Sequence, residues 1–352
     1  MAPRPKYIEV ANIITRRIDN GDYFLKDIPG ERRIADATGV SYMTARKAVN
    51  ELLTQRILSR KENGALKIHP SYNRKLGKIH TVFLYPSYPS NHLNQCRSIV
   101  TEALNEHDAI LRPLQYTHWD DPVLLEAFDN ADGIILIAST EPITAHALSQ
   151  LNMQNNKVVI FDSDFTEQGI PSIQLFPREH LYKLFEHVAK QCGKKIDLLN
   201  TQGHDNEIYR RIDLWKSWAK ENGIETNVWD DPAPAFTDSR ERAYKLTKKL
   251  IDKKSFNANA IICTTQDVAV GASRACHDRS IQIGDELSIC SINIGAEAKY
   301  FYPSITGLDF PVINKQLKTC IDWFSPKVKN WKQSLLLTSS TPNLFLGEST
   351  GH

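Results

Sequence analysis

The sequence lacks paired cysteines, long apolar runs and an apolar leader segment. Its six cysteines are scattered singly along the chain: Cys96, Cys192, Cys263, Cys276, Cys290 and Cys320. None belongs to a CxxC pair, so the usual zinc and dithiol redox motifs are excluded. No stretch approaches the ~20 apolar residues of a membrane helix, and the first ten residues, MAPRPKYIEV, lack the core of a signal peptide. We therefore expect a cytoplasmic protein without a metal site or a membrane partner.

Common cofactor and catalytic motifs are also missing. The sequence contains no GxGxxG after a strand pattern, no GxxxxGK[ST] and no HExxH. Two weaker catalytic readings stay open: Asp162 with Asp164 as an acid/base pair, and Cys263 with Cys276 and His277 as a thiol or metal site. Ligand contacts or turn capping by the carboxylates, and packing by the cysteines, explain these residues more simply. An enzyme is the least favoured class, and we expect no cofactor.

Positive charge is concentrated at the start of the chain. Residues 1–78 hold 16 Lys or Arg against 8 Asp or Glu, whereas the remaining residues hold 27 against 33. At 352 residues the chain is long enough for two or three domains of ~100 to 200 residues. A basic first domain favours a polyanionic partner, although a solvated positive face would give the same count.

The basic segment predicts three short helices followed by a hairpin. Apolar residues recur at helical spacing over 7–20, from Ile34 to Ala37 before Gly39, and from Ala45 to Leu53 after Ser41. The segment ILSRKENGALKI reads as strand, turn and strand. Ser41 is a good N-cap for the third helix, whose exposed side carries polar and basic residues. Two closely coupled helices of this kind form a helix-turn-helix, with the second helix placed to enter the DNA major groove. A small helical bundle with a basic surface is the alternative.

The stretch IPGERRIADATGVSYMTARKAVNELL resembles LPSERELAxxLGVSRxTVRxALxxL, the signature of GntR-type winged helices. The resemblance covers residues 7–68 and implies an α+β winged helix-turn-helix that binds operator DNA. Tyr42 stands where the family usually has Arg. The DNA-contacting residues expected from the resemblance and from the exposed helix face are Arg32, Tyr42, Thr44, Arg46, Lys47, Asn63 and Gly64.

A second domain is predicted to follow a polar linker. We divide the chain into a DNA-binding domain at residues 1–68, a linker at 69–78 and a core at 79–352. In the core, short apolar runs alternate with helical patterns, which predicts parallel sheets covered by helices. About a dozen strands favour two similar lobes over a single sheet.

The loops after these strands are rich in hydroxyl, amide and carboxylate groups. They include residues 86–92, 139–140, 162–164, 201–205, 265–267 and 293. Open parallel sheets bind ligands at the carboxyl ends of their strands, and such groups hydrogen-bond polar small molecules. The sequence therefore predicts a polar ligand in the core.

The core resembles the effector-binding domain of LacI/GalR regulators, which is related to periplasmic sugar-binding proteins. The segments that carry the resemblance are DGIILIAST, VVIFDSD, RRIDLWKSWAKENGI, ANAIICTTQDVAVGASRAC, LSICSIN, PSITGLDFP and FLGEST. By resemblance, Asp162, Arg211 and Asn293 contact the ligand, while Thr265 and Gln266 occupy the family's Asn-Asp pair. The full set of expected ligand-binding residues is Tyr88, His92, Ser139, Asp162, Asp164, Arg211, Phe236, Gln266 and Asn293.

With both resemblances in one chain, the sequence is similar to arabinose-responsive repressors of this mixed architecture. They imply a homodimeric transcription regulator, expected to be a repressor, which binds a pseudo-palindromic operator and responds to a carbohydrate-like effector. The alternative is a small-molecule-binding module whose basic domain contacts RNA or protein.

Overall fold

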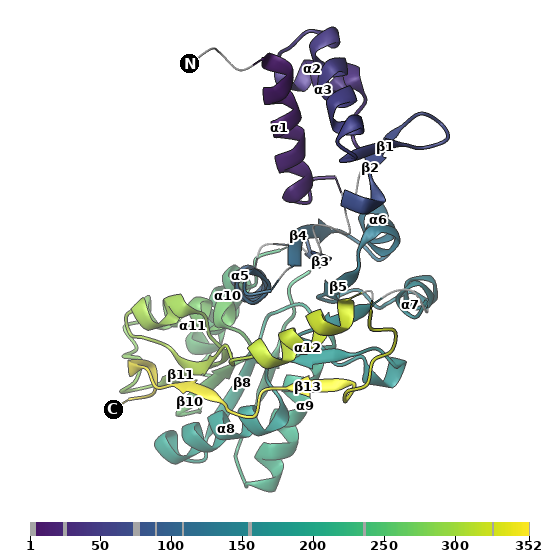
Figure 1. The fold of residues 1–352 in the computed structure, drawn as a ribbon. Coiled ribbons are helices and arrows are strands. Elements are labelled where there is room, and N and C mark those ends of the chain that lie inside the picture. Colours follow the sequence, from purple (N-terminus) through teal and green to yellow (C-terminus); the bar gives the residue numbers. More distant parts are fainter. Residues whose placement is uncertain are drawn as a thin grey trace.

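The computed structural model describes residues 5–23, 27–72, 78–88, 90–107, 109–153, 157–234, 237–325 and 327–351. Figure 1 shows a small N-terminal domain at one end of the molecule and a larger core that holds the C-terminus. The predicted fold class, a winged helix-turn-helix followed by a two-lobed α/β core, is confirmed.

The N-terminal domain contains three helices and a two-stranded antiparallel hairpin. Its elements are α1 (Lys6–Asp19), α2 (Glu31–Thr38), α3 (Tyr42–Thr54), β1 (Leu58–Arg60) and β2 (Leu66–Ile68). The apolar stripes predicted from the sequence meet in one core, where Ile14 and Val49 are almost fully buried. Gly39 ends α2 with a φ of +66°, a conformation that favours glycine, and the Ser41 hydroxyl accepts a hydrogen bond from the Thr44 N–H at the start of α3.

The hairpin forms a wing that is tied to α2. Gly64 turns the chain with a φ of +82°, and the Asn63 side chain accepts a hydrogen bond from the Ala65 N–H. Arg60 donates both to the Gly64 carbonyl and to the Glu31 carboxylate. The wing is thus held at a fixed position beside the helix-turn-helix.

The first lobe of the core is built on a parallel sheet of six strands, in the order β13-β7-β6-β5-β3-β4. Its elements are β3 (Ile79–Pro86), α5 (Asn91–Asn105), β4 (Ala109–Tyr116), α6 (Pro122–Asn130), β5 (Gly133–Leu136), α7 (Ala145–Leu151), β6 (Val158–Phe161), η1 (Thr166–Gln168), β7 (Ser172–Gln174), α12 (Asn314–Phe324) and β13 (Leu336–Thr338).

The second lobe repeats this arrangement, with the strand order β14-β12-β11-β10-β8-β9 and one antiparallel pair between β12 and β14. Its elements are α8 (Arg178–Cys192), β8 (Ile196–Asn200), α9 (Asn206–Glu221), β9 (Val228–Asp230), α10 (Ser239–Asp252), β10 (Ala260–Cys263), α11 (Gln266–His277), β11 (Ser288–Asn293), η2 (Ala296–Tyr300), β12 (Thr306–Asp309), β14 (Asn343–Phe345) and η3 (Glu348–Thr350). The described core has twelve strands in two sheets, so the sequence-based prediction of two lobes is confirmed.

The chain passes between the lobes three times: after β7, after β12 and after β13. Each lobe therefore contains segments from distant parts of the sequence. Because the β-strands in each lobe are mostly parallel, their carboxyl ends and the polar loops after them gather at one edge of each sheet. Those two edges provide the walls of the candidate ligand site.

The Lys157 ammonium group closes the end of α12. Its Nζ atom donates to the carbonyl oxygens of Trp323, Ser325 and Val328, each at 2.7 Å. Hydrogen bonds from charged groups contribute ~1.5 to 3 kcal/mol, and partial solvent exposure reduces this value here. We expect Lys157→Met to lower the free energy of unfolding by about 1 to 2 kcal/mol in urea titrations, whereas Lys327→Met, at an exposed position nearby, should change little. Equal midpoints for the two variants would contradict this role.

Candidate functional site

The exposed face of α3 displays the side chains expected to contact DNA. Tyr42, Arg46 and Lys47 are exposed, whereas the neighbouring residues Ala45 and Ala48 are fully buried. The chain thus presents its polar and basic side chains outward from a rigid helix. Met43, which was not among the expected DNA-contacting residues, is 66% exposed at the start of the same helix. Its apolar side chain could pack against a thymine methyl group.

The other predicted DNA-contacting residues lie around this helix. Arg32 is exposed on α2, and Asn63 and Gly64 are exposed at the wing tip. Thr44 is partly buried, and its hydroxyl group is hydrogen-bonded at 2.9 Å to the hydroxyl group of Ser41, the N-cap residue of α3. Lys47 lies 4.4 Å from the centre of the Tyr7 ring, a cation-π contact that limits where its ammonium group can reach. DNA contact by these residues stays a prediction.

A cleft lies between the two lobes, at the carboxyl ends of both sheets. It contains about 770 Å³ of space, part of it open to solvent. The first lobe contributes the loop after β3, the start of α5 and the loops after β5 and β6, and the second contributes the starts of α9 and α11 and the segment after β11. Six of the expected ligand-binding residues line this cleft: Tyr88, His92, Asp162, Arg211, Gln266 and Asn293.

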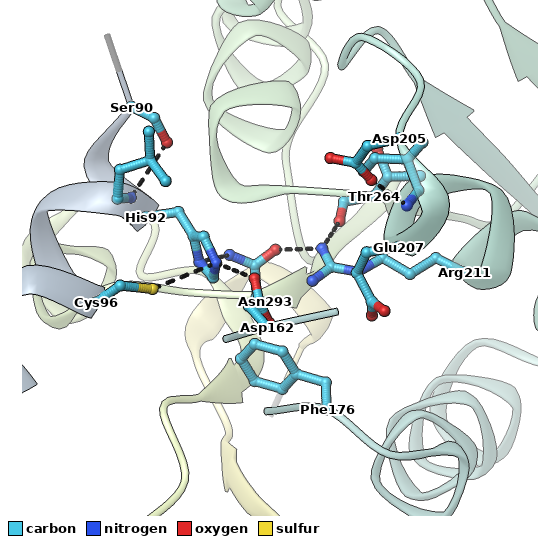
Figure 2. A network of polar contacts seen from close by, with 12 residues as sticks. Ser90, His92, Cys96, Asp162, Phe176, Asp205, Glu207, Arg211, Thr264 and Asn293 are labelled. Atoms are coloured by element: carbon cyan, nitrogen blue, oxygen red, sulfur yellow. Dashed lines mark hydrogen bonds and ion pairs between the residues drawn. The ribbon is translucent and has the colours of Figure 1, made fainter. Parts of the chain in front are cut away.

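Polar side chains form a continuous network across the cleft, and Figure 2 shows it as a row of dashed contacts. Arg211 Nη1 donates to Asn293 Oδ1 at 2.6 Å, and Asn293 Nδ2 lies 3.3 Å from His92 Nδ1. His92 Nε2 in turn contacts Asp162 Oδ2. Because Arg211 and Asn293 belong to the second lobe and His92 and Asp162 to the first, this network joins the two lobes directly.

Most of the Arg211 guanidinium group is used inside the protein. The residue is 3% exposed, and besides Asn293 its Nη1 atom donates to the Thr264 carbonyl at 2.7 Å, while Nε donates to Glu207 Oε1 at 3.3 Å. Nη2 makes no hydrogen bond to the described residues and is left for a ligand. The resemblance implied ligand contact by Arg211, and the geometry leaves one nitrogen of its guanidinium group for that contact.

Asp162 is held in an unusual backbone conformation. Its φ is +68°, in the left-handed region that a non-glycine residue seldom adopts, and the residue is 8% exposed. Strain of this kind persists only where the surroundings fix it, and it often marks binding sites. The turn that it makes after β6 brings the carboxylate to His92 at the base of the cleft.

The acid and base groups of the cleft have shifted pKa values. The pKa of Asp205 is raised to about 6, mainly by burial and also by the nearby carboxylates of Glu207 and Asp162, while the Ile208 N–H and Arg211 act to lower it. Burial also raises the pKa of Asp267. The pKa of His92 is raised above its usual value because Cys96 and Asp162 outweigh the lowering effect of burial.

Two expected ligand-binding residues are not brought into the cleft. Ser139 accepts a hydrogen bond from the Glu141 N–H, and Asp164 accepts from Thr166, so both side chains stabilise their own turns. Neither lines the cleft. Phe236 lies outside the described residues.

Several lining residues are additional to the expected ligand-binding set. Ser90, Asn91, Ser163, Gln202, Asp205 and Asp267 lie in the polar loops named from the sequence, whereas Gln95, Glu207 and Glu297 lie outside those loops. Gln266 shows why such partners were missed: its amide donates to Glu297 Oε1 at 2.7 Å and accepts from the Gly295 N–H. Only the folded chain places the start of α11 beside the segment after β11.

Two cysteines and one serine that lie in nucleophile-like sequence patterns are buried. Cys263 and Cys276 are fully buried, and burial raises the pKa of the Cys276 thiol to about 12. Residues 347–351 spell GxSxG, but Ser349 is fully buried and donates to the Ile289 carbonyl. Within the described chain no three His, Cys, Asp or Glu side chains are grouped so as to hold a metal ion. No helix of the described chain is both long and apolar enough to cross a membrane.

Family comparisons agree with the two domains. Residues 6–68 match the family "Bacterial regulatory proteins, gntR family", and residues 185–314 match the "Periplasmic binding protein-like domain". Among curated proteins, the chain is similar to the HTH-type transcriptional regulator GalR of Streptococcus thermophilus, with 22% identity over 48% of this chain and 55% of the relative. The chain thus spans about half the length of the curated relatives it matches.

Solved structures show the same core fold. The transcription regulator CcpA of Lactococcus lactis aligns with a TM-score of 0.62 and 18% identity, covering 78% of this chain and 99% of that protein. A LacI family transcriptional regulator from Enterococcus faecium, solved with bound ribose, aligns with a TM-score of 0.61 and 16% identity over 77% of this chain and 98% of that one. At these identities the likeness shows the fold.

Proposed function

We propose that this chain, which joins a gntR-type domain to a periplasmic binding protein-like core, is a transcription regulator whose affinity for operator DNA changes when a polar small molecule binds between the lobes. One observation carries the proposal: a winged helix with an exposed basic recognition helix and a cleft crossed by a polar network occur in the same chain. We keep the division into a DNA-binding domain (1–68), a linker (69–78) and an effector-binding core (79–352), and we place the protein in the cytoplasm, where an operator is accessible.

The winged helix supports sequence-specific DNA binding. Arg46 and Lys47 stand at the exposed start of α3, where a recognition helix meets base edges and phosphates. A single winged helix reads a short half-site, and two copies related by a two-fold axis would read a pseudo-palindrome with higher affinity and specificity. We therefore propose a homodimer that acts as a repressor.

The cleft supports control by a small molecule. Polar groups from both lobes face it, so a ligand that contacts both walls favours the closed arrangement of the lobes over an open one. Closure would change the distance between the two winged helices of a dimer and hence their fit to two half-sites. The ribose-bound neighbour supports a carbohydrate-like effector.

Selection of binding sites from random duplex DNA by the full-length protein tests the proposal. We expect an enriched pseudo-palindrome, bound with a salt-dependent affinity, and a change in that affinity when the effector is added. Equal binding to all duplexes, with specific capture of RNA or a protein instead, would favour the alternative of a ligand-binding module whose basic domain contacts those partners.

The same selection tests the role of Tyr42. This residue is 44% exposed at the first position of α3, where relatives of the GntR type usually have Arg. A phenol can contact a thymine methyl group or a phosphate but cannot form the bidentate pair that Arg makes with guanine. We expect half-sites without a guanine requirement at that position, and Tyr42→Arg should introduce one. A guanine preference in the wild-type protein that disappears in Tyr42→Ala would contradict this assignment.

A further inference from the structure

Carboxylates dominate the walls of the interlobe cleft. Five of them line it: Asp162, Asp205, Glu207, Asp267 and Glu297. Arg210 and Arg211 both contact Glu207, His92 contacts Asp162, and Arg240 lies 3.9 Å from Asp267. Glu297 is contacted by the amide groups of Gln95 and Gln266, which carry no charge. Asp205 and Glu297 therefore line the cleft without an ion pair to any described residue.

The cations near the cleft are already engaged. Arg211 is held by Glu207, Thr264 and Asn293. Arg240 is 3.9 Å from Asp267 but makes two shorter contacts, at 3.1 and 3.0 Å, with Asp238. An anionic ligand such as a sugar phosphate or a sugar acid would thus meet carboxylates that are opposed mainly by one guanidinium nitrogen, Arg211 Nη2.

Two buried polar atoms of cleft-lining residues have no hydrogen-bond partner among the described residues. They are Asp162 Oδ1 and Thr265 Oγ1. Burying a carboxylate oxygen without a donor is costly, so a ligand group that donates to Asp162 Oδ1 would relieve that cost. This observation points to a donor at the base of the cleft and is independent of the total charge.

Asp162 and Asp205 approach the cleft from opposite lobes. Asp162 follows β6 of the first lobe, and Asp205 is the N-cap of α9 in the second, where its Oδ1 accepts from the Ile208 N–H. Asp205 Oδ2 makes no hydrogen bond to the described residues. Burial is the main cause of the raised pKa of Asp205 and the Asp162 carboxylate adds to it, so the two carboxylates repel each other. Figure 2 shows Asp205 on the opposite side of the network from His92.

Helix N-termini offset part of this negative charge. The starts of α9 and α11 face the cleft, and each carries about half a positive charge. Asp205 caps the first of these helices, and Asp267 lies in the first turn of the second, so each helix end is already opposed by a carboxylate of its own. The Asp162 carboxylate is still available to a cation, because His92 contacts only its Oδ2 atom and its Oδ1 atom has no partner among the described residues.

We propose that the effector carries a protonated amine, which binds between Asp162 of the first lobe and Asp205 of the second. The inference rests on the proposed function only in taking the cleft ligand as the effector. A cation between the two carboxylates turns their repulsion into attraction from both lobes and so favours closure. The described residues offer no group of three metal ligands, which favours an organic cation over a metal ion. Amide side chains around this position suit hydroxyl groups, so the ligand class is an amino sugar or aminocyclitol.

Matched ligand pairs test the inference on the full-length protein. The probes are D-glucosamine, D-galactosamine, D-mannosamine and 2-deoxystreptamine, with the N-acetyl derivative and 6-phosphate of each hexosamine and the parent hexoses. We expect at least one amine to raise the melting temperature and to bind at least tenfold more tightly, by calorimetry at pH 7.5, than its N-acetyl, phosphate or hydroxyl counterpart. Equal or tighter binding of a neutral or anionic counterpart, or no binding of any amine at millimolar concentration, would overturn it.

A variant and its control locate the amine. Asp205→Asn should weaken binding of the amine about tenfold and remove its advantage over the N-acetyl derivative, whereas Asp213→Asn, at an exposed position on the same helix, should leave both unchanged. Asp205 has a pKa of about 6 in the free protein, so a bound cation that favours its ionised form should displace a proton near that pH. Affinity should accordingly fall as the pH drops below 6, and the heat of binding at pH 6 should depend on the buffer. Loss of affinity in Asp205→Asn for the amine and the N-acetyl derivative alike, without proton release, would place the amine elsewhere.

Operator binding separates this inference from the proposed function. An amine that binds but leaves operator affinity unchanged would refute effector control while supporting the charge assignment. A neutral hexose that changes operator affinity would support the regulator and refute the amine.

Discussion

Replacing Arg211 by alanine is expected to lower the free energy of unfolding of the core by about 3 kcal/mol and to abolish ligand binding. The side chain is 3% exposed, and its removal leaves the Thr264 carbonyl and Asn293 Oδ1 buried without the donor they now share. Breaking a buried ion pair usually costs ~3 to 5 kcal/mol, and we expect the lower end because Arg210 still contacts Glu207. Urea unfolding of the full-length protein, followed by tryptophan fluorescence, measures the change.

Two further variants separate charge from geometry. Arg211→Lys keeps the positive charge but cannot reach three acceptors at once, so it should stay folded at room temperature and bind ligand at least tenfold more weakly. Arg210→Ala removes the other Glu207 contact from a side chain that is 23% exposed, and its stability loss should be smaller. A wild-type midpoint for Arg211→Ala would show that the network contributes little to the core.

The winged helix could be predicted almost residue by residue because its signals are local. Ser41, Gly39 and Gly64 mark a helix start, a helix end and a turn through their own backbone preferences, and the structure has each at that position. The apolar spacing of α1 and α3 likewise depends only on neighbouring residues. The predicted helix-turn-helix and wing are confirmed.

In the core, several strands carry little strand signal in their sequences. β4 contains Arg112 and Pro113, and proline removes a backbone donor that a central strand needs. The structure places β4 at the edge of its sheet, paired with β3 alone, so the missing donor is tolerated there. β7, β9 and β13 have only three residues each, too few for a periodic pattern.

The residues of the candidate ligand site could also be predicted only in part from local sequence. Choosing polar residues that follow a predicted strand identified Asp162 and Asn293, which line the cleft. The same criterion also selected Ser139 and Asp164, whose side chains cap their own turns. Glu297 is brought to the cleft by a turn of η2 and two amide contacts from distant helices, which no local pattern encodes. Tertiary contacts therefore decide which polar loop residues face the ligand.

Arg46→Ala is expected to weaken operator binding by about 1 to 3 kcal/mol, roughly ten- to more than a hundredfold, while leaving ligand binding intact. Arg46 is exposed on α3, and the buried core of the winged helix does not depend on its side chain, so the domain should stay folded. A phosphate contact would also reduce the salt dependence of binding by about one unit, whereas a guanine contact would relax specificity at one base pair. Fluorescence anisotropy with operator DNA at several salt concentrations distinguishes the two.

Because the two sites lie in separate domains, variants of the ligand site and of the DNA-binding site should have separate effects. Arg211→Lys should bind operator DNA with wild-type affinity in the absence of ligand and should fail to respond when ligand is added, whereas Arg46→Ala should keep the ligand-induced rise in melting temperature. Lys216→Ala, which removes an exposed positive charge from α9 of the core, is the matched control and should change neither property. Wild-type operator affinity for Arg46→Ala at moderate salt would refute the placement of α3 in the major groove. A loss of operator affinity in Arg211→Lys without ligand would instead show that the buried network of the core holds the two winged helices in their DNA-binding arrangement.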